Sequence, residues 1–260
     1  MTIPTSNLLK SDWRITQVGG GCVETGTAFA LTIDPGSGRY HNAQIADYDY
    51  APRIPFRWHP PLRLTVRARA ALDPASGVGT AGFGFWNHPF SPDSWRIRLP
   101  RAIWFFYAAP PNDMRLARGV PGHGWKAAVI DAARPSALML APAAPLLIPL
   151  LNLPAFYDRF YPIIQRRLAI AETALDPALL ESARTYTIDW RRDGASFTVD
   201  GRSVMQTDRA PLGACGLIAW IDTQFAVVHP GGRLAFGTRT LTAPQSLFIE
   251  SIQIESDPSS

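Results

Sequence analysis

Short runs of alternating apolar and polar residues fill most of this chain, and turn-forming residues separate one run from the next. In the stretch TYTIDWRRDGASFTVDG at 185–201, Tyr186, Ile188 and Trp190 occupy alternate positions, and an Asp-Gly pair interrupts the alternation at 193–194. A second alternating run follows and ends at another Asp-Gly pair. A period of two is typical of strands, so this stretch predicts a β-hairpin followed by a second tight turn.

Similar runs recur along the whole sequence. They are found at 13–33, 40–50, 62–70, 95–99, 102–108, 216–228 and 246–254. The 24 prolines and 20 glycines are spread between the runs, which is typical of many short strands and argues against an all-helical protein. With 260 residues, 47% of them apolar and 18% charged, one large β domain can bury its own core. We therefore expect a single all-β domain over 1–260.

Two of these segments resemble a known family. The hairpin at 185–201 resembles that of the concanavalin A-like jelly rolls, most closely the family 16 glycoside hydrolases and the laminin-G-like and pentraxin-like domains around them. The segment GTAGFGFWNH at 79–88 resembles the aromatic strand that precedes the catalytic strand of family 16, with Phe85 and Trp86 at the matching positions. The resemblance implies a two-sheet antiparallel jelly-roll sandwich.

The chain departs from family 16 on the strand that would carry out hydrolysis. The family carries Glu-x-Asp-x-Glu there, because alternate spacing puts the carboxylates on one face and a retaining enzyme needs two of them about 5 Å apart. In this chain residues 102–109 are all apolar or aromatic, with Trp104 and Phe106 at the alternating positions. The hydrolytic mechanism of the family is therefore not expected. Either this strand is buried on both faces, or a sugar cleft has become an aromatic, apolar pocket.

A helical, apolar insertion interrupts the β pattern at 136–183. Residues 137–153 carry no charge, but 17 residues with three prolines make a poor membrane-spanning helix. An apolar stripe at helical spacing follows from Pro154. A large apolar surface needs a cover, so we expect the insertion to form either a lid, with residues 137–175 over an aromatic pocket, or a wall at one rim of the sandwich. The alternative is docking of the same segment on a membrane surface, with three arginines near the lipid headgroups: Arg159, Arg166 and Arg167.

The predicted pocket brings together aromatic and polar residues from several strands. Asp222 lies between Trp220 and Gln224 in an alternating pattern, so the three side chains are expected on one face. Burial near an apolar wall would raise the pKa of this carboxyl, which is the condition for a general acid or base. The alternative role of Asp222 is structural, as the partner of an arginine or of loop amides. The expected substrate contacts are Trp86, His88, Trp104, Phe106, Trp220 and Gln224.

Two classes of function stay open. The first is a non-hydrolytic protein that binds a hydrophobic small molecule such as an isoprenoid, polyketide or lipid and, as an enzyme, cyclises, isomerises or hydrates it with Asp222 as the acid or base. The second is a carbohydrate-binding, lectin-like protein or a glycoside hydrolase with relocated carboxylates. The missing acidic motif, the apolar insertion and the lack of an export signal favour the first class.

Other chemistry is not indicated by the sequence. The five histidines are scattered, and no phosphate-binding or dinucleotide-binding motif is present, so neither a metal nor a cofactor is expected. The net charge is +4, but no run of basic residues exceeds two, so nucleic acid is not an expected partner. Cys22 and Cys215 lie far apart and suit a reducing compartment, and a cytoplasmic location is expected.

Overall fold

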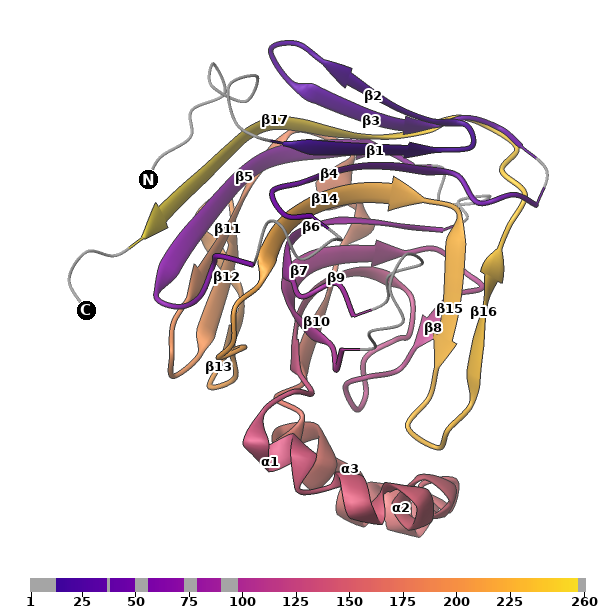
Figure 1. Ribbon diagram of the computed structural model, residues 1–260, viewed down its shortest axis with the longest axis vertical. Coiled ribbons are helices and arrows are strands. Elements are labelled where there is room, and N and C mark those ends of the chain that lie inside the picture. Colours follow the sequence, from indigo (N-terminus) through magenta and orange to yellow (C-terminus); the bar gives the residue numbers. More distant parts are fainter. Residues whose placement is uncertain (1–12, 37, 50–55, 73–78, 90–97, 257–260) are drawn as a thin grey trace.

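The computed structural model describes residues 13–36, 38–49, 56–72, 79–89 and 98–256. They form two seven-stranded sheets that enclose a common core (Figure 1). Sheet A contains, in spatial order, β1 (Arg14–Val18), β4 (Asn42–Ala46), β14 (Gly216–Asp222), β6 (Thr80–Trp86), β7 (Arg101–Ala108), β9 (Gly124–Asp131) and β10 (Ala171–Leu175). Sheet B contains β13 (Arg202–Thr207), β12 (Ala195–Val199), β11 (Arg184–Trp190), β5 (Leu62–Ala71), β17 (Gln245–Ser256), β3 (Phe29–Ile33) and β2 (Gly21–Thr25).

Neighbouring strands in both sheets are antiparallel, so the predicted two-sheet jelly-roll sandwich is confirmed. A third, small sheet joins β16 (Leu234–Thr238), β15 (Gln224–Val228) and β8 (Asp113–Met114), and β15 runs parallel to β8. Part of the strand expected at 95–99 lies outside the described residues.

The hairpin at 185–201 is present as β11 and β12, and its second turn leads into β13. The turn uses two residues of positive φ, Asp200 at 48° and Gly201 at 77°. This geometry matches the right-handed twist of the flanking strands. The Asp200 carboxylate also accepts a 2.9 Å hydrogen bond from the backbone N–H of Thr185, which fixes the strand that pairs with β12.

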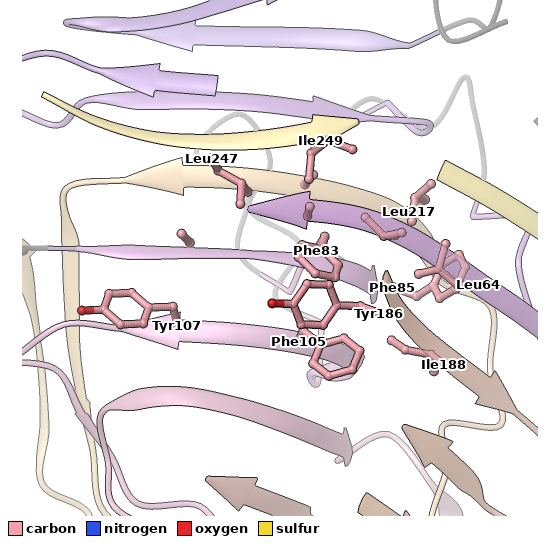
Figure 2. Packing of buried hydrophobic residues seen from close by; sticks show 14 of the residues in the cluster. Leu64, Phe83, Phe85, Phe105, Tyr107, Tyr186, Ile188, Leu217, Leu247 and Ile249 are labelled. Carbon is pink, nitrogen blue, oxygen red and sulfur yellow. The ribbon is translucent and has the colours of Figure 1, made fainter. Parts of the chain in front are cut away.

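Alternation along these strands builds the core between the sheets (Figure 2). Phe83 of β6 meets Tyr186 of β11 with ring centroids 5.2 Å apart, and Phe105 of β7 meets the same ring at 5.0 Å. Phe85 meets Trp190 at 5.4 Å. Aromatic pairs of this kind add packing energy of about 0.5–1.5 kcal/mol each beyond the apolar area that they bury. The hairpin is thus the part of sheet B against which the central strands of sheet A pack.

The apolar strand at 102–109 divides its side chains between two environments. Ile103, Phe105 and Tyr107 face the core, whereas Trp104 and Phe106 lie on the opposite face of β7. Trp104 remains partly exposed. Burial on both faces therefore holds for most of the strand but not for Trp104, which leaves an aromatic surface on sheet A.

The insertion is helical over a shorter range than the predicted 136–183. It contains α1 (Pro135–Leu138), the 3₁₀ turn η2 (Ala141–Ala143), α2 (Ala144–Leu150) and α3 (Pro154–Arg167). β10 then returns to sheet A, and a second 3₁₀ turn, η3 (Pro177–Leu180), precedes β11. The apolar stripe that begins at Pro154 ends with α3, and residues 171–175 pair with β9 and join the sheet. No described helix is long and apolar enough to cross a membrane.

Candidate functional site

Most of the predicted site residues lie on or beside the face of sheet A that points away from sheet B, hereafter the outer face. Strand registers fix which side chains lie beside one another across this face. One row consists of Gln44, Trp220, Gly82, Phe106, Lys126 and Ala174. The next row consists of Ala46, Ile218, Gly84, Trp104, Ala128 and Glu172.

Four rings on the outer face, Trp86, Trp104, Phe106 and Trp220, touch one another and are hereafter the aromatic cluster. Trp104 is the centre, with ring centroids 5.3 Å from Trp220, 5.4 Å from Phe106 and 5.8 Å from Trp86. Phe106 and Trp220 are each 7% exposed, whereas Trp86 and Trp104 are partly exposed. The two partly exposed indoles are therefore the rings that a ligand can reach.

Glycines on β6 make this contact possible. Trp220 lies on β14 and Phe106 on β7, so β6 separates them and their backbones are about 10 Å apart at the usual strand spacing. The outer-face residues of β6 between Thr80 and Trp86 are Gly82 and Gly84. A Cβ on Gly82 would lie 2.9 Å from the Trp220 ring and 2.5 Å from the carbonyl oxygen of Phe105. Without side chains on β6, the rings of the neighbouring strands can meet above it.

Asp222 is the buried end of a hydrogen-bond chain that holds Trp220. The indole Nε1–H of Trp220 donates to Thr80 Oγ1 at 2.9 Å, and the Thr80 hydroxyl donates to Asp222 Oδ1 at 2.8 Å. The same carboxylate oxygen accepts the backbone N–H groups of Thr80 and Gln224, each at 3.1 Å. Asp222 thus orients one ring of the cluster through Thr80, in keeping with the structural role left open by the sequence.

Burial raises the pKa of the Asp222 carboxyl to about 7, because its side chain is removed from water and the three hydrogen bonds offset only part of that cost. Asp222 is 5% exposed. A carboxyl with this pKa can exchange a proton near neutral pH, as expected for a general acid or base. Its bonded oxygen, however, is already occupied by donors of the protein.

His88 lies at the edge of the aromatic cluster. Its ring meets Trp86 edge to face with centroids 4.8 Å apart and lies 6.0 Å from the Tyr48 ring. Burial, and secondarily the charge of Arg98, lowers the pKa of His88 to about 4, so the imidazole is neutral at neutral pH. The Nε1–H of Trp86 donates to the Tyr48 hydroxyl, which ties this ring to the strand end after β4.

Gln224 does not share a face with Asp222, and the expected alternation through it is wrong. The strand predicted at 216–228 breaks at Thr223, whose backbone N–H donates to the carbonyl of His41 at 3.1 Å. Gln224 begins β15 in the third sheet, and its side chain is exposed. The hydrogen bond from its backbone to Asp222 bends the chain in the manner of an Asx turn.

Among the described strands of sheet A, two carboxylates lie on the outer face, Asp222 on β14 and Glu172 on β10, and they do not form a catalytic pair. Four strand spacings separate these strands, or about 19 Å along the sheet. Glycosidase carboxyl pairs are about 5 Å apart in retaining enzymes and up to about 9.5 Å apart in inverting enzymes. In the part of the chain that the structure describes, the two-carboxylate arrangement is therefore not found on this face.

Glu172 has a different partner. It pairs with Lys126 at 3.5 Å, and both side chains are almost fully buried. Burial raises the pKa of Glu172 and lowers that of Lys126. The carboxylate also accepts the backbone N–H of Ala117 at 2.9 Å, and the ammonium lies 3.4 Å from the carbonyl oxygen of Met114. The pair holds the 114–117 loop, and Met114 in turn packs against the apolar cluster that includes Phe106 and Trp220.

The helices lie beyond β10, at the rim of sheet A (Figure 1). The Tyr161 hydroxyl of α3 donates to the carbonyl of Leu116, and Asn152 donates to the carbonyl of Gly231 at 2.9 Å. These contacts tie the insertion to the loop after β8 and to the turn between β15 and β16. The lid that the sequence predicted over the aromatic cluster is thus not formed by these helices, which extend the rim.

Several residues of this site were missed in the sequence. In the segment TAGFGFW, the small residues Thr80, Gly82 and Gly84 occupy alternate positions. This alternation is the sign in the sequence that one face of the strand carries small side chains, beside the rings of the neighbouring strands. Lys126 and Glu172 gave no sign, because they are distant in sequence and meet only when β9 pairs with β10. Among the described residues, no group of three or more His, Cys, Asp or Glu side chains is arranged to hold a metal ion.

Comparison with known proteins identifies the fold. No family model and no curated protein sequence matches the chain. A Crh5 transglycosylase solved in complex with NAG superposes with a TM-score of 0.52 at 15% identity, over 98% of this chain and 83% of that one. A Bacillus licheniformis β-glucanase gives 0.51 at 11% identity, over 99% of this chain and 98% of that one. A native glycosidic hydrolase gives 0.52 at 14% identity, over 99% of this chain and 95% of that one.

These likenesses confirm the concanavalin A-like jelly-roll fold. At such low identity they establish the fold alone.

Proposed function

We propose that this protein binds a saccharide on the outer face of sheet A and does not cleave it by the two-carboxylate mechanism. The observation that carries the proposal is the pair of partly exposed indoles, Trp86 and Trp104, with ring centroids 5.8 Å apart on the sheet face of a jelly roll. Sugar rings have apolar C–H faces that pack on aromatic rings, and their hydroxyls need polar partners at the edge of the same surface.

The surroundings of the indoles support this use. Tyr48 holds the Trp86 indole by a hydrogen bond, and Asp222 holds that of Trp220 through Thr80. Rings fixed in this way lose little conformational entropy when a ligand packs on them. The similar structures are named as a transglycosylase bound to NAG, a β-glucanase and a glycosidic hydrolase, which also supports a carbohydrate ligand.

Cleavage is not part of the proposal because the acidic residues are in the wrong places. Trp104 and Phe106 lie at the alternating positions of β7 where family 16 carries carboxylates. Asp222 is buried and bonded to Thr80, and Glu172 is bonded to Lys126. Neither carboxylate has a second one within reach on the outer face of the described strands. One glycosidic bond therefore cannot be flanked by a nucleophile and an acid, or by a base and an acid.

The test is a fluorescence and calorimetric titration of the purified protein with N-acetylglucosamine oligomers and with β-1,3- and β-1,4-linked glucose oligomers. Trp86→Ala and Trp104→Ala are each expected to weaken binding about tenfold or more, and Trp104→Phe should retain part of the affinity. The matched control is Trp13→Ala, which removes a partly buried indole that packs on Phe29 instead of on the cluster.

Two results would overturn the proposal. The first is the absence of binding to every oligosaccharide while the protein is folded. The second is release of new reducing ends at a rate that Asp222→Asn or Glu172→Gln abolishes, since that would restore an acidic mechanism on this face.

A hydrophobic small molecule is the second candidate ligand. It is favoured by the aromatic character of β7, whose outer-face residues Trp104 and Phe106 offer apolar contacts. In this case the same titration with long-chain isoprenoid or fatty alcohols would quench the tryptophans, whereas the oligosaccharides would not. Turnover of such a ligand that is lost in Asp222→Asn would support the cyclase or isomerase form of this function.

A further inference from the structure

The helical insertion exposes an unusual amount of apolar surface. Among the described residues, half of the exposed large apolar side chains lie between 135 and 167. Met139 is 73% exposed, Leu146 68% and Leu153 56%. Monomeric soluble proteins rarely expose contiguous apolar patches of this kind without a partner.

The patch continues onto a neighbouring element. The turn between β15 and β16 contacts α2, because Gly231 accepts a hydrogen bond from Asn152 at 2.9 Å and Gly232 lies against the Ile148 side chain. The next residues of β16 include two exposed apolar side chains, Leu234 and Phe236. Figure 1 shows α1, α2 and α3 projecting beyond the β10 edge, with the end of the β15–β16 hairpin near α2.

Exposed charges at the edge of this tip are mainly positive, and the centre of the tip carries none. Residues 135–157 contain no ionisable group except Tyr157. On α3, three arginines are exposed: Arg159, Arg166 and Arg167. The one acidic residue of α3, Asp158, is paired with Arg118 at 2.8 Å. An apolar centre bordered by arginines complements a bilayer surface that carries anionic headgroups.

We propose that the tip formed by α1, α2, α3 and the β15–β16 turn docks on the surface of an anionic lipid bilayer. The helices lie in the interface and do not cross it, because α3 has 14 residues and is about 21 Å long, shorter than the roughly 30 Å hydrocarbon core. Met139, Leu146 and Leu153 enter the headgroup and acyl boundary, and the α3 arginines contact phosphates. This inference is independent of the proposed saccharide binding.

The experiment is co-sedimentation of the full chain with sucrose-loaded vesicles of phosphatidylcholine alone or with 30% phosphatidylglycerol. We expect binding to the anionic vesicles at least tenfold tighter than to the neutral ones and weaker in high salt. Met139→Glu combined with Leu146→Glu should lower the affinity tenfold or more. Its matched control is Ile15→Glu combined with Leu212→Glu, which makes the same charge change at two exposed apolar positions outside the tip.

The arginines are tested separately. Arg166→Gln combined with Arg167→Gln should weaken binding to anionic vesicles by roughly fivefold per arginine and leave binding to neutral vesicles unchanged. The control is the exposed pair at the β11–β12 turn, Arg191→Gln combined with Arg192→Gln. Circular dichroism and thermal melting of each variant establish that the fold is kept.

Three outcomes would overturn the proposal. One is wild-type protein that stays in the supernatant with anionic vesicles. Another is a Met139→Glu, Leu146→Glu variant that binds as well as its control. The third is sedimentation velocity showing a wild-type dimer that this variant dissociates, without vesicle binding by the wild type, which would make a second copy of the chain the occupant of the tip.

Discussion

Replacing Asp222 by Asn is expected to stabilise this protein at alkaline pH and not at acidic pH. The asparagine side chain keeps an oxygen that can accept from Thr80 and from the backbone of Gln224, as Asp222 Oδ1 does. It removes the one feature that is unfavourable in this position, a negative charge with 5% exposure. The substitution thus separates the hydrogen-bonding role of Asp222 from its charge.

The magnitude follows from the difference between the folded and unfolded pKa of Asp222. Burial raises the pKa from 3.8 to about 7. Between these values the unfolded chain has lost the proton and the folded chain still holds it, so the free energy of unfolding falls as pH rises. The loss is complete above pH 7 and amounts to about 4 kcal/mol, at about 1.4 kcal/mol per pH unit. The wild type and Asp222→Asn should therefore be similarly stable near pH 4 and differ by up to about 4 kcal/mol near pH 8.

Urea denaturation at pH 4, 6 and 8, followed by tryptophan fluorescence and circular dichroism, measures this difference. Asp193→Asn serves as the control, because Asp193 is exposed at the β11–β12 turn and the same charge is removed. A difference between wild type and Asp222→Asn that does not change with pH would refute the reasoning. So would a variant that is less stable than the wild type at pH 8, since the carboxylate would then be stabilised where it is.

Three further outcomes follow from other contacts. Because the pKa of His88 is about 4 in the folded protein and 6.5 in the unfolded chain, the wild type should lose about 3 kcal/mol of unfolding free energy as the pH falls from 6.5 towards 4. His88→Asn should not show this loss, and denaturation at pH 4 and pH 7 measures the difference. Gly82→Ala should cost about 2 kcal/mol and alter the near-ultraviolet dichroism of the indoles, whereas Gly26→Ala, with nothing within 4 Å of the new Cβ, should be nearly neutral. Lys126→Met should lower the free energy of unfolding by about 3–5 kcal/mol, because it leaves Glu172 buried without its cation. In a double-mutant cycle, the variant that combines Lys126→Met with Glu172→Gln should regain much of this free energy.

The fold could be predicted because its main signals are local. Alternation at 185–201 and Asp-Gly turns specify a hairpin before any long-range contact forms, and β11 and β12 follow that pattern. The alternation of β7 also placed Trp104 and Phe106 on one face. Whether that face is buried or forms part of a pocket stays open in the sequence, because both sets of alternate positions on β7 are large and apolar. Only the pairing of β7 with β6 and β9 decides it.

The errors have physical causes as well. In GLIAWIDTQFAVV there is no glycine or proline after the first residue, so the break at Thr223 leaves no mark in the sequence. It arises from long-range hydrogen bonds to His41 and from the Asx turn at Asp222. A helical insertion is expected from the sequence, but its place beside the sheets depends on Tyr161 and Asn152, which meet loops that are distant in sequence. An amphipathic pattern indicates that a helix is apolar on one side, but it does not predict which element packs against that side.

The loop that follows β8 connects the two surfaces for which functions are proposed. Met114 packs against the apolar cluster that includes Phe106 and Trp220, and its carbonyl lies near the buried ammonium of Lys126. Two residues later Leu116 accepts the Tyr161 hydroxyl of α3, and Arg118 pairs with Asp158. Breaking a buried ion pair costs more free energy than breaking an exposed one, so the contact at Lys126 stabilises this loop more than the contact at Arg118 does.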